Sequence, residues 1–384
     1  MPKKLEADIT PEMLKYARKR VGLSSDEVSR KINKQLTEKI LLDWENGNLK
    51  PSISQMRKIS KLYKLPLAAF FLSEVPEYFN VRSIPDKRML DININMPLSY
   101  HMNLAILWAD QTREIALELL DVSDHAVPIF EESIIISKDL DSIANHIRDK
   151  IGISIDEQFQ FKNSYDAFRK WKGAIEKYGI LTLTFNNVSV QEARGFSIYN
   201  KILPIIAINI KDSVNAKIFT LIHEYVHLLL KTDGICDNND IFIENNEEST
   251  CNQLAGRILI PHDSIIATIA SNRYDLKDIN NINLLANKYH LSKEAILTRL
   301  LLLNYISESD YLIKRDNLYK DKKSSKGLFA PYKRTITNYG YPFLNLVFTS
   351  YYQNKISLRT LSNYLSSSIE NLQKIENAIF KNGN

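Results

Sequence analysis

The sequence has few of the features that mark membrane, secreted or disulfide-bonded proteins. Its apolar runs, such as Leu67–Leu72 and Leu300–Leu303, are far shorter than the roughly 20 residues that a transmembrane helix needs. The first twenty residues intersperse charges and lack the apolar stretch of a secretory signal. Two cysteines, Cys236 and Cys251, are too few for a disulfide framework in a chain of 384 residues. The composition therefore predicts a cytoplasmic protein without membrane contact.

The chain is long and its charge is unevenly distributed. With 384 residues and 44% hydrophobic content, it exceeds the size at which one core keeps growing, so two or three packed units are expected. Residues 1–70 contain 15 Lys/Arg and 8 Asp/Glu, a net charge of +7, whereas the whole chain carries +5 and the remainder therefore −2. A basic N-terminal unit on a slightly acidic body predicts that any nucleic-acid contact lies at the N-terminus.

Residues 1–75 are predicted to form a compact all-α unit of short helices joined by tight turns. Apolar residues recur at helical spacing, and capping residues mark a helix over 25–32, a third helix capped by Thr37 and a fourth that begins near Ser52. The stretch 73–96 breaks the periodicity and is rich in Pro, Asn and Asp, so it marks the first boundary.

The rest of the chain predicts helices around a small sheet. Residues 180–185 alternate like a strand, and 195–199 pair with 203–209 as a hairpin, which together predict a small antiparallel sheet. A Lys- and Ser-rich stretch over 314–327 is predicted to be an exposed loop. The other predicted helices are 98–120, 142–151, 164–178, 213–230 and 247–260, and the chain after residue 260 is predicted to be helical outside this loop. The fold class is therefore α+β and mostly helical, with domains at 1–75, 76–150, 151–310 and 311–384.

The motif His223-Glu224-Tyr225-Val226-His227 has the spacing of a catalytic zinc site. Residues four apart share a face of a helix, so both imidazoles can reach one zinc ion while Glu224 lies beside the open position of the metal. Such a zinc ion activates a water, and Glu224 acts as the general base. The alternative is a helix that carries two histidines by chance. Because the surrounding residues are strongly apolar, three unpartnered polar groups there would be costly, which favours the metal site.

A third protein ligand is expected about one helix length downstream. Glu247 and Glu248 both begin the helix predicted over 247–260, and the spacing alone does not choose between them. Either glutamate could instead be an ordinary acidic residue that the positive end of the helix dipole favours.

These residues resemble the ImmA/IrrE family of metallopeptidases, in the form fused to an XRE-type helix-turn-helix domain. The segments that carry the resemblance are Glu192–Ser197, Leu203–Asn209, Ile218–Glu224, Glu248–Ala255 and Leu259–Pro261. The resemblance implies a zincin-like domain in which Glu248 is the third zinc ligand. It also implies a site-specific protease that inactivates repressors or stress regulators. Cys251 and Leu254 replace the usual alanine and phenylalanine, which alters packing rather than chemistry.

The N-terminal unit resembles the XRE helix-turn-helix through Leu23–Val28, Trp44–Gly47 and Lys50–Ser52. A recognition helix of this type enters the major groove by its N-terminal end, which makes the expected contacts Gln35, Thr37 and Lys39. The turn over 33–36 is about one residue longer than usual. The alternative is a module for protein–protein contact, because acidic residues dilute the positive charge of this helix. Two half-sites on DNA would favour a homodimer.

Two residues of the hairpin are candidates for stabilising the oxyanion of the reaction. Arg194 and Tyr199 belong to the segment expected to flank the cleft, and both carry donors suited to a developing negative charge. The alternative role for both is packing of the hairpin.

Two functions follow from the sequence. The first is a DNA-binding zinc endopeptidase that cleaves a repressor or antitoxin-like protein to control a stress response or a mobile element. The second is a DNA-bound transcriptional regulator whose metal site senses a ligand without significant proteolysis. The intact Glu224 favours the first, because a structural zinc needs no general base.

Overall fold

The computed structural model describes residues 5–32, 36–76, 98–122, 129–232, 234–236, 247–320 and 330–381. These residues are mostly helical with one small sheet, which confirms the predicted α+β class. The chain divides into two compact units: Met1–Ser83 with Ile92–Trp108, and Ile84–Asp91 with Ala109–Asn384. Helix α5 (Tyr100–Val122) begins in the first unit and continues in the second. In the described residues, no helix is both long and apolar enough to cross a membrane.

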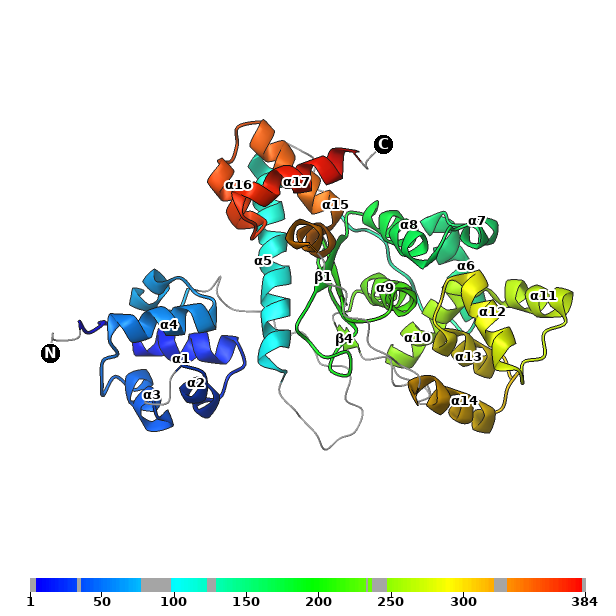
Figure 1. The fold of residues 1–384 in the computed structure, drawn as a ribbon, viewed down its shortest axis with the longest axis horizontal. Coiled ribbons are helices and arrows are strands. Elements are labelled where there is room, and N and C mark those ends of the chain that lie inside the picture. Colours follow the sequence, from blue (N-terminus) through cyan, green and yellow to red (C-terminus); the bar gives the residue numbers. More distant parts are fainter. Residues whose placement is uncertain are drawn as a thin grey trace. The chain divides into compact units, whose positions relative to one another are not determined.

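The first unit is a bundle of short helices (Figure 1), and side-chain caps mark the starts of its third and fourth helices. Thr37 accepts a hydrogen bond from the Ile40 amide, and Ser52 forms a capping box with Gln55. The predicted starts of these helices are thus confirmed, whereas most of the predicted boundary over 73–96 lies outside the described residues. The elements are α1 (Pro11–Arg20), α2 (Ser25–Ile32), α3 (Glu38–Glu45), α4 (Ile53–Tyr63) and the 3-10 helix η1 (Leu67–Phe71).

A buried ion pair ties α1 to α3 inside this unit. The guanidinium of Arg18 donates two hydrogen bonds to the Glu45 carboxylate, at 2.7 and 2.8 Å, and a third to the Leu23 carbonyl at 3.0 Å. The Glu45 side chain is only 1% exposed. The geometry is bidentate and the acid is desolvated, so the pair fixes the angle between the two helices. The apolar core of this unit includes Met13, Leu14, Ala17, Leu41, Trp44, Met56 and Ile59.

The second unit contains a four-stranded sheet in the order β1-β3-β2-β4. The predicted hairpin is confirmed, because β2 pairs antiparallel with β3. However, β1 pairs parallel with β3, so the sheet is mixed and not purely antiparallel. Alternation along the sequence identifies a strand but not its neighbour, and here β3 lies between β1 and β2. The strands are β1 (Leu181–Phe185), β2 (Gly195–Ile198), β3 (Ile205–Asn209) and β4 (Gly234–Cys236).

Helix α9 (Val214–Leu229) contacts β2 and β3 on one side and the helices α8 (Ser164–Glu176) and α10 (Glu247–Leu259) on the other. Ser213 caps its N-terminus by accepting from the Ala216 amide, as its place in the sequence predicts. Almost every residue in the second half of α9 is buried. Its polar side chains are therefore held in the interior of the domain.

The C-terminal end of α10 is held by three long polar side chains. Arg148 donates to the Ile258 carbonyl at 2.6 Å, Gln158 to Leu259 at 3.2 Å, and Arg299 to Ile260 at 3.0 Å. These contacts satisfy carbonyls that have no partner within the helix. Arg148 belongs to α6 (Leu140–Ile151), Gln158 to the short helix α7 (Ile155–Phe159), and Arg299 to α13 (Lys293–Leu302). The position of α10 against α9 is thus fixed from three elements.

The remaining helices follow the prediction except at one place. Residues 314–320, expected to be an exposed loop, form the second half of α14 (Glu308–Lys320), and 321–327 lie outside the described residues. The first turn of α14 is anchored by the buried Tyr311, and the helix then continues through these polar residues. A polar composition is compatible with a helix on the surface. The other helices are α11 (His262–Asn272), α12 (Ile279–Tyr289), α15 (Pro331–Tyr352), α16 (Leu358–Tyr364) and α17 (Ile369–Lys381).

Helix α15 covers the outer edge of β1 (Figure 1). It is broken at Gly340, whose φ of 71° is compatible with glycine, and a Cβ there would lie 3.1 Å from the Thr182 carbonyl. The Asn338 amide, oriented with its nitrogen toward β1, donates to the Thr184 carbonyl at 3.3 Å. The C-terminal helices are therefore packed directly on the sheet.

Candidate functional site

The motif residues His223, Glu224 and His227 lie on α9, with side chains that are fully buried. The four-residue spacing places both imidazoles on the face of α9 that packs against α10. On α10, Glu248 is the second residue and is also buried. Packing of the two helices therefore brings the predicted metal ligands together.

The three side chains converge at a spacing that suits a metal ion. The Nε2 atoms of His223 and His227 are 3.1 Å apart, and each lies 3.2 Å from a different carboxylate oxygen of Glu248. Ligand atoms bound at about 2.0–2.1 Å to one tetrahedral zinc ion lie about 3.3–3.4 Å from each other. The donor set of two imidazoles and one carboxylate also fits zinc. These residues could thus hold one divalent ion with little rearrangement.

The electrostatics of Glu248 favour its charged form. Burial by itself would raise the pKa of this carboxyl, but hydrogen bonds from His223 and His227 outweigh burial and hold the pKa well below its usual range. A ligand must be deprotonated to bind a metal, and Glu248 meets this condition. Glu247, the other candidate, lies 3.4 Å from Nδ1 of His227, on the side of the ring away from Glu248.

The Glu224 carboxylate is in a different environment. It is fully buried, and neither of its oxygens makes a hydrogen bond to the residues that the structure describes. Burial raises the pKa of this carboxyl, against the opposing effects of the two histidines and of the nearby Ser197 hydroxyl. A raised pKa makes a carboxylate a stronger proton acceptor. Glu224 therefore has the properties expected of a general base: a buried carboxylate with unbonded oxygens and a raised pKa.

Strand β2 forms the surface beneath Glu224, and it does so because residue 195 is a glycine. A Cβ at Gly195 would lie 2.6 Å from Cγ2 of Thr220, 3.0 Å from Oε1 of Glu224 and 3.1 Å from the Ala207 carbonyl. Two of these neighbours are on α9 and one is on β3, so a side chain at this position would push the helix off the sheet. The glycine sets the separation between Glu224 and β2.

We expect Gly195→Ala to lower the free energy of unfolding by about 1–3 kcal/mol, because overpacking forces neighbours apart. Any activity that depends on Glu224 should fall with it. Chemical denaturation monitored by circular dichroism measures the change. The matched control is Gly173→Ala on α8, where a Cβ meets no atom within 4 Å. This control should be neutral or stabilising by about 0.5–1 kcal/mol, and equal effects of both substitutions would contradict the prediction.

The structure places the two proposed oxyanion residues differently. The guanidinium of Arg194 faces Asp212 at 3.3 Å and Glu294 at 3.8 Å, and neither acid belongs to the histidine cluster. Tyr199 follows β2 directly and is partly buried against the main core. The guanidinium of Arg194 is therefore paired with Asp212 and Glu294, which supports a structural role for Arg194 more than a catalytic one.

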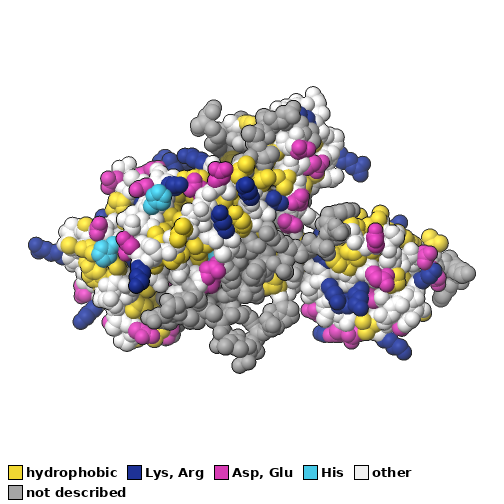
Figure 2. Space-filling model, turned by 180° about the vertical axis from the view of Figure 1, so that it is seen from behind, with side chains coloured by type: hydrophobic (Ala, Val, Ile, Leu, Met, Phe, Trp, Pro, Cys, Tyr) yellow, Lys and Arg dark blue, Asp and Glu magenta, His cyan; other side chains and the backbone are white. Residues whose placement is uncertain are grey.

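The predicted DNA contacts lie at the start of α3, but only two of the three are described. Lys39 is exposed on the first turn, and Thr37 is the exposed N-cap, while Gln35 lies outside the described residues. Glu38 accepts a hydrogen bond from Ser25 on α2. Figure 2 shows Lys and Arg side chains beside Asp and Glu on one face of this unit, so that face is mixed in sign.

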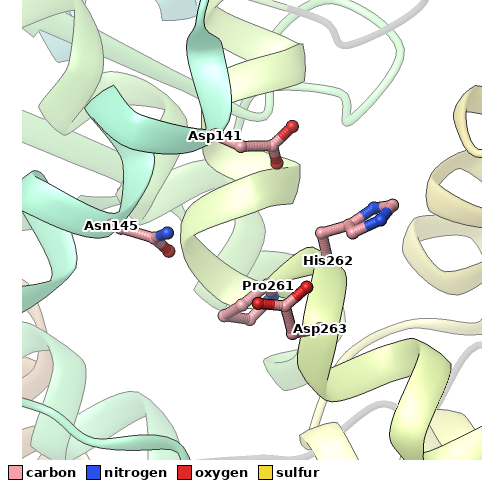
Figure 3. A pocket seen from close by; sticks show the side chains of 5 residues that line it. All are labelled: Asp141, Asn145, Pro261, His262 and Asp263. Carbon is pink, nitrogen blue, oxygen red and sulfur yellow. The ribbon is translucent and has the colours of Figure 1, made fainter.

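A separate small pocket lies where α6 meets the start of α11 (Figure 3). The side chains of Asp141 and Asn145 point from α6 toward Pro261, His262 and Asp263. Its volume of about 170 Å³ is below the roughly 300–1,000 Å³ of typical small-molecule sites. Asp141 is also held by ion pairs to Arg257 and Arg299. The pocket is thus a polar surface feature distinct from the histidine cluster.

Some groups around the cluster have no signal in the sequence. Thr232, just after α9, lies 3.2 Å from Nδ1 of His227, and Cys251 lies 3.5 Å from the same atom. The sequence shows Gly195 as the start of a strand and as part of the resemblance, but not that a Cβ there would lie 3.0 Å from Oε1 of Glu224. A threonine or a glycine at such positions is common, so only the packing shows its role.

The fold and the site thus define a chain with a helix-turn-helix unit and a domain that buries a His–His–Glu cluster. Residues 14–70 match the helix-turn-helix family model, and residues 175–301 match the model of the IrrE N-terminal-like domain, a peptidase family. The chain therefore carries an XRE-type helix-turn-helix domain fused to an IrrE-like peptidase domain, as its sequence predicts. No match was found among curated proteins or among solved structures.

Proposed function

We propose that this protein is a DNA-binding regulatory zinc metallopeptidase that cleaves a specific repressor or antitoxin-like protein. The observation that carries the proposal is the arrangement of His223, His227 and Glu248 as a ligand set beside the buried, unbonded carboxylate of Glu224. A buried carboxylate without a donor is costly unless a ligand completes it. The helix-turn-helix match supports DNA as the second partner and the cytoplasm as the compartment.

The chemistry follows from the positions of these side chains. His223, His227 and Glu248 would hold the zinc, which supplies an activated water and polarises the scissile carbonyl. Glu224, on the same helix turn as His223, takes a proton from the attacking water and delivers it to the leaving amine. Burial keeps competing solvent donors away from this carboxylate. The raised pKa of Glu224 suits both the acceptance and the later donation of the proton.

Residues 1–75 are proposed to direct the peptidase to DNA. The +7 charge of the first seventy residues favours phosphate contacts, which release counterions and make binding depend on salt. The mixed signs around α3 limit the number of such contacts. The proposed DNA contacts are Gln35, Thr37 and Lys39, and the exposure of Thr37 and Lys39 at the start of α3 supports the proposal.

We expect operator binding by the full chain to weaken as salt rises, and Lys39→Gln to reduce the slope of log K against log salt by about 1. Fluorescence anisotropy with labelled duplexes selected from the adjoining genomic region measures both quantities. Lys293→Gln, an exposed substitution at the start of α13, should leave the slope unchanged. Binding without any salt dependence would instead favour a protein–protein role for this unit.

The alternative function is a DNA-bound regulator whose metal site senses a ligand without proteolysis. Both functions use the same three ligands, but only the peptidase requires Glu224 next to the metal. The deciding experiment incubates zinc-loaded protein with repressors encoded beside it and follows cleavage by mass spectrometry. Cleavage that requires Glu224 supports the peptidase, whereas metal-dependent changes in DNA binding without any cleavage would support the sensor.

A further inference from the structure

Three side chains surround the Nδ1 atom of His227, on the side of the ring away from the metal ligands. The Thr232 hydroxyl lies at 3.2 Å, the Glu247 carboxylate at 3.4 Å and the Cys251 thiol at 3.5 Å. On the opposite side of the ring, Nε2 faces His223 and Glu248. The ring is thus held between the two adjacent glutamates of α10.

Two of these groups can accept a hydrogen bond from a proton on Nδ1. The Thr232 hydroxyl donates to the backbone carbonyl of His227 at 3.3 Å, so its oxygen is left to accept from Nδ1. A charged Glu247 carboxylate can only accept. In a His227 that binds a metal ion through the lone pair of Nε2, the proton is on Nδ1 and can be donated to these two acceptors. This is the tautomer that a metal ligand requires.

We propose that Glu247 is a positioning residue that, with Thr232, holds the His227 ring and its tautomer ready for the metal. The inference rests on the proposed function, because it assigns Glu247 a part in the same site. Residues 247 and 248 are about 100° apart around the helix, so one carboxylate reaches Nε2 and the other Nδ1. A carboxylate on the far nitrogen also strengthens the imidazole as a ligand.

The second imidazole of the site provides an internal contrast. Within the described residues, Nδ1 of His223 makes no hydrogen bond, although the ring is fully buried. The effect of Glu247 should therefore be confined to His227. An acidic residue that served only the dipole of α10 would show no such preference for one ring.

The test compares Glu247→Gln with the wild-type chain, both loaded with zinc. Competition with a chromophoric chelator measures zinc affinity, and NMR of ¹⁵N-histidine-labelled protein detects the Nδ1–H resonance of His227. We expect Glu247→Gln to weaken zinc binding by about 10–100-fold and to shift the His227 resonance while that of His223 stays unchanged. Asp263→Asn, which removes a first-turn acid from α11, is the matched control and should keep the wild-type affinity.

The outcomes separate this inference from the proposed function. Equal zinc affinity and an unshifted His227 resonance in Glu247→Gln would overturn the positioning role and leave the peptidase assignment intact. Loss of affinity in Thr232→Val but not in Glu247→Gln would also overturn it, because the hydroxyl alone would then orient the ring. A wild-type chain that binds no zinc would overturn the proposed function, and this inference with it.

Discussion

Replacing Glu224 by glutamine is expected to reduce peptide hydrolysis by about 10²–10⁴-fold while zinc stays bound. Glutamine has the size of glutamate but cannot take a proton from the attacking water. Because the proposed ligand atoms belong to His223, His227 and Glu248, the substitution removes none of them. Single-turnover cleavage of the identified partner protein, with zinc content measured in parallel, tests both parts.

The stability of this variant serves as its control. Glu224 is buried and makes no hydrogen bond to the described residues, so removing its charge should leave the melting temperature unchanged or raise it. A loss of activity together with a large loss of stability or zinc would therefore point to misfolding. Normal cleavage by a stable, zinc-loaded Glu224→Gln protein would rule out Glu224 as the general base.

Replacing Arg18 by methionine is expected to destabilise the first unit by about 3–5 kcal/mol, because it leaves the Glu45 carboxylate buried without a partner. DNA binding should be lost at temperatures at which the peptidase domain stays folded. Hydrogen exchange measured on peptides from α1 to α4 reports this local change, which a single unfolding curve for two units would obscure.

Two further variants check the cause of this effect. In Arg18→Met with Glu45→Leu, apolar side chains replace the whole pair, and most of the stability should return. Arg30→Met removes a cation from the exposed pair with Asp26, which should cost no more than about 1 kcal/mol. Wild-type exchange rates in Arg18→Met alone would show that the buried pair contributes little.

Much of the fold could be predicted from short-range signals in the sequence. Thr37, Ser52 and Ser213 each cap the helix that their position predicts, because capping depends only on neighbouring residues. The parallel pairing of β1 with β3 had no such signal, since it depends on which strands meet. In the same way, the polar residues 314–320 have no apolar stripe that would predict a helix, although they continue α14, which packs against α13.

In the candidate site, too, the features set by neighbouring residues could be predicted, whereas those set by tertiary packing could not. His223 and His227 are four residues apart on one helix, so their convergence follows from helix geometry alone. Whether Glu247 or Glu248 faces them depends on how α10 is rotated against α9, and spacing along the sequence carries no information about that rotation. The family resemblance selected Glu248, and the structure places that carboxylate between the two Nε2 atoms.

Because α15 packs along the outer edge of β1, it limits where a further strand could pair with this sheet. The two edge strands are β1 and β4, and the outer edge of β1 faces α15 at the carbonyls of Thr182 and Thr184. Among the described residues, the outer edge of β4 is therefore the one with neither a strand partner nor this helix against it. An extended peptide that joined the sheet would therefore run along Gly234–Cys236, one strand away from the glycine beneath Glu224. By covering β1, α15 thus leaves the β4 edge for added strands, although it contributes none of the described residues of the histidine cluster.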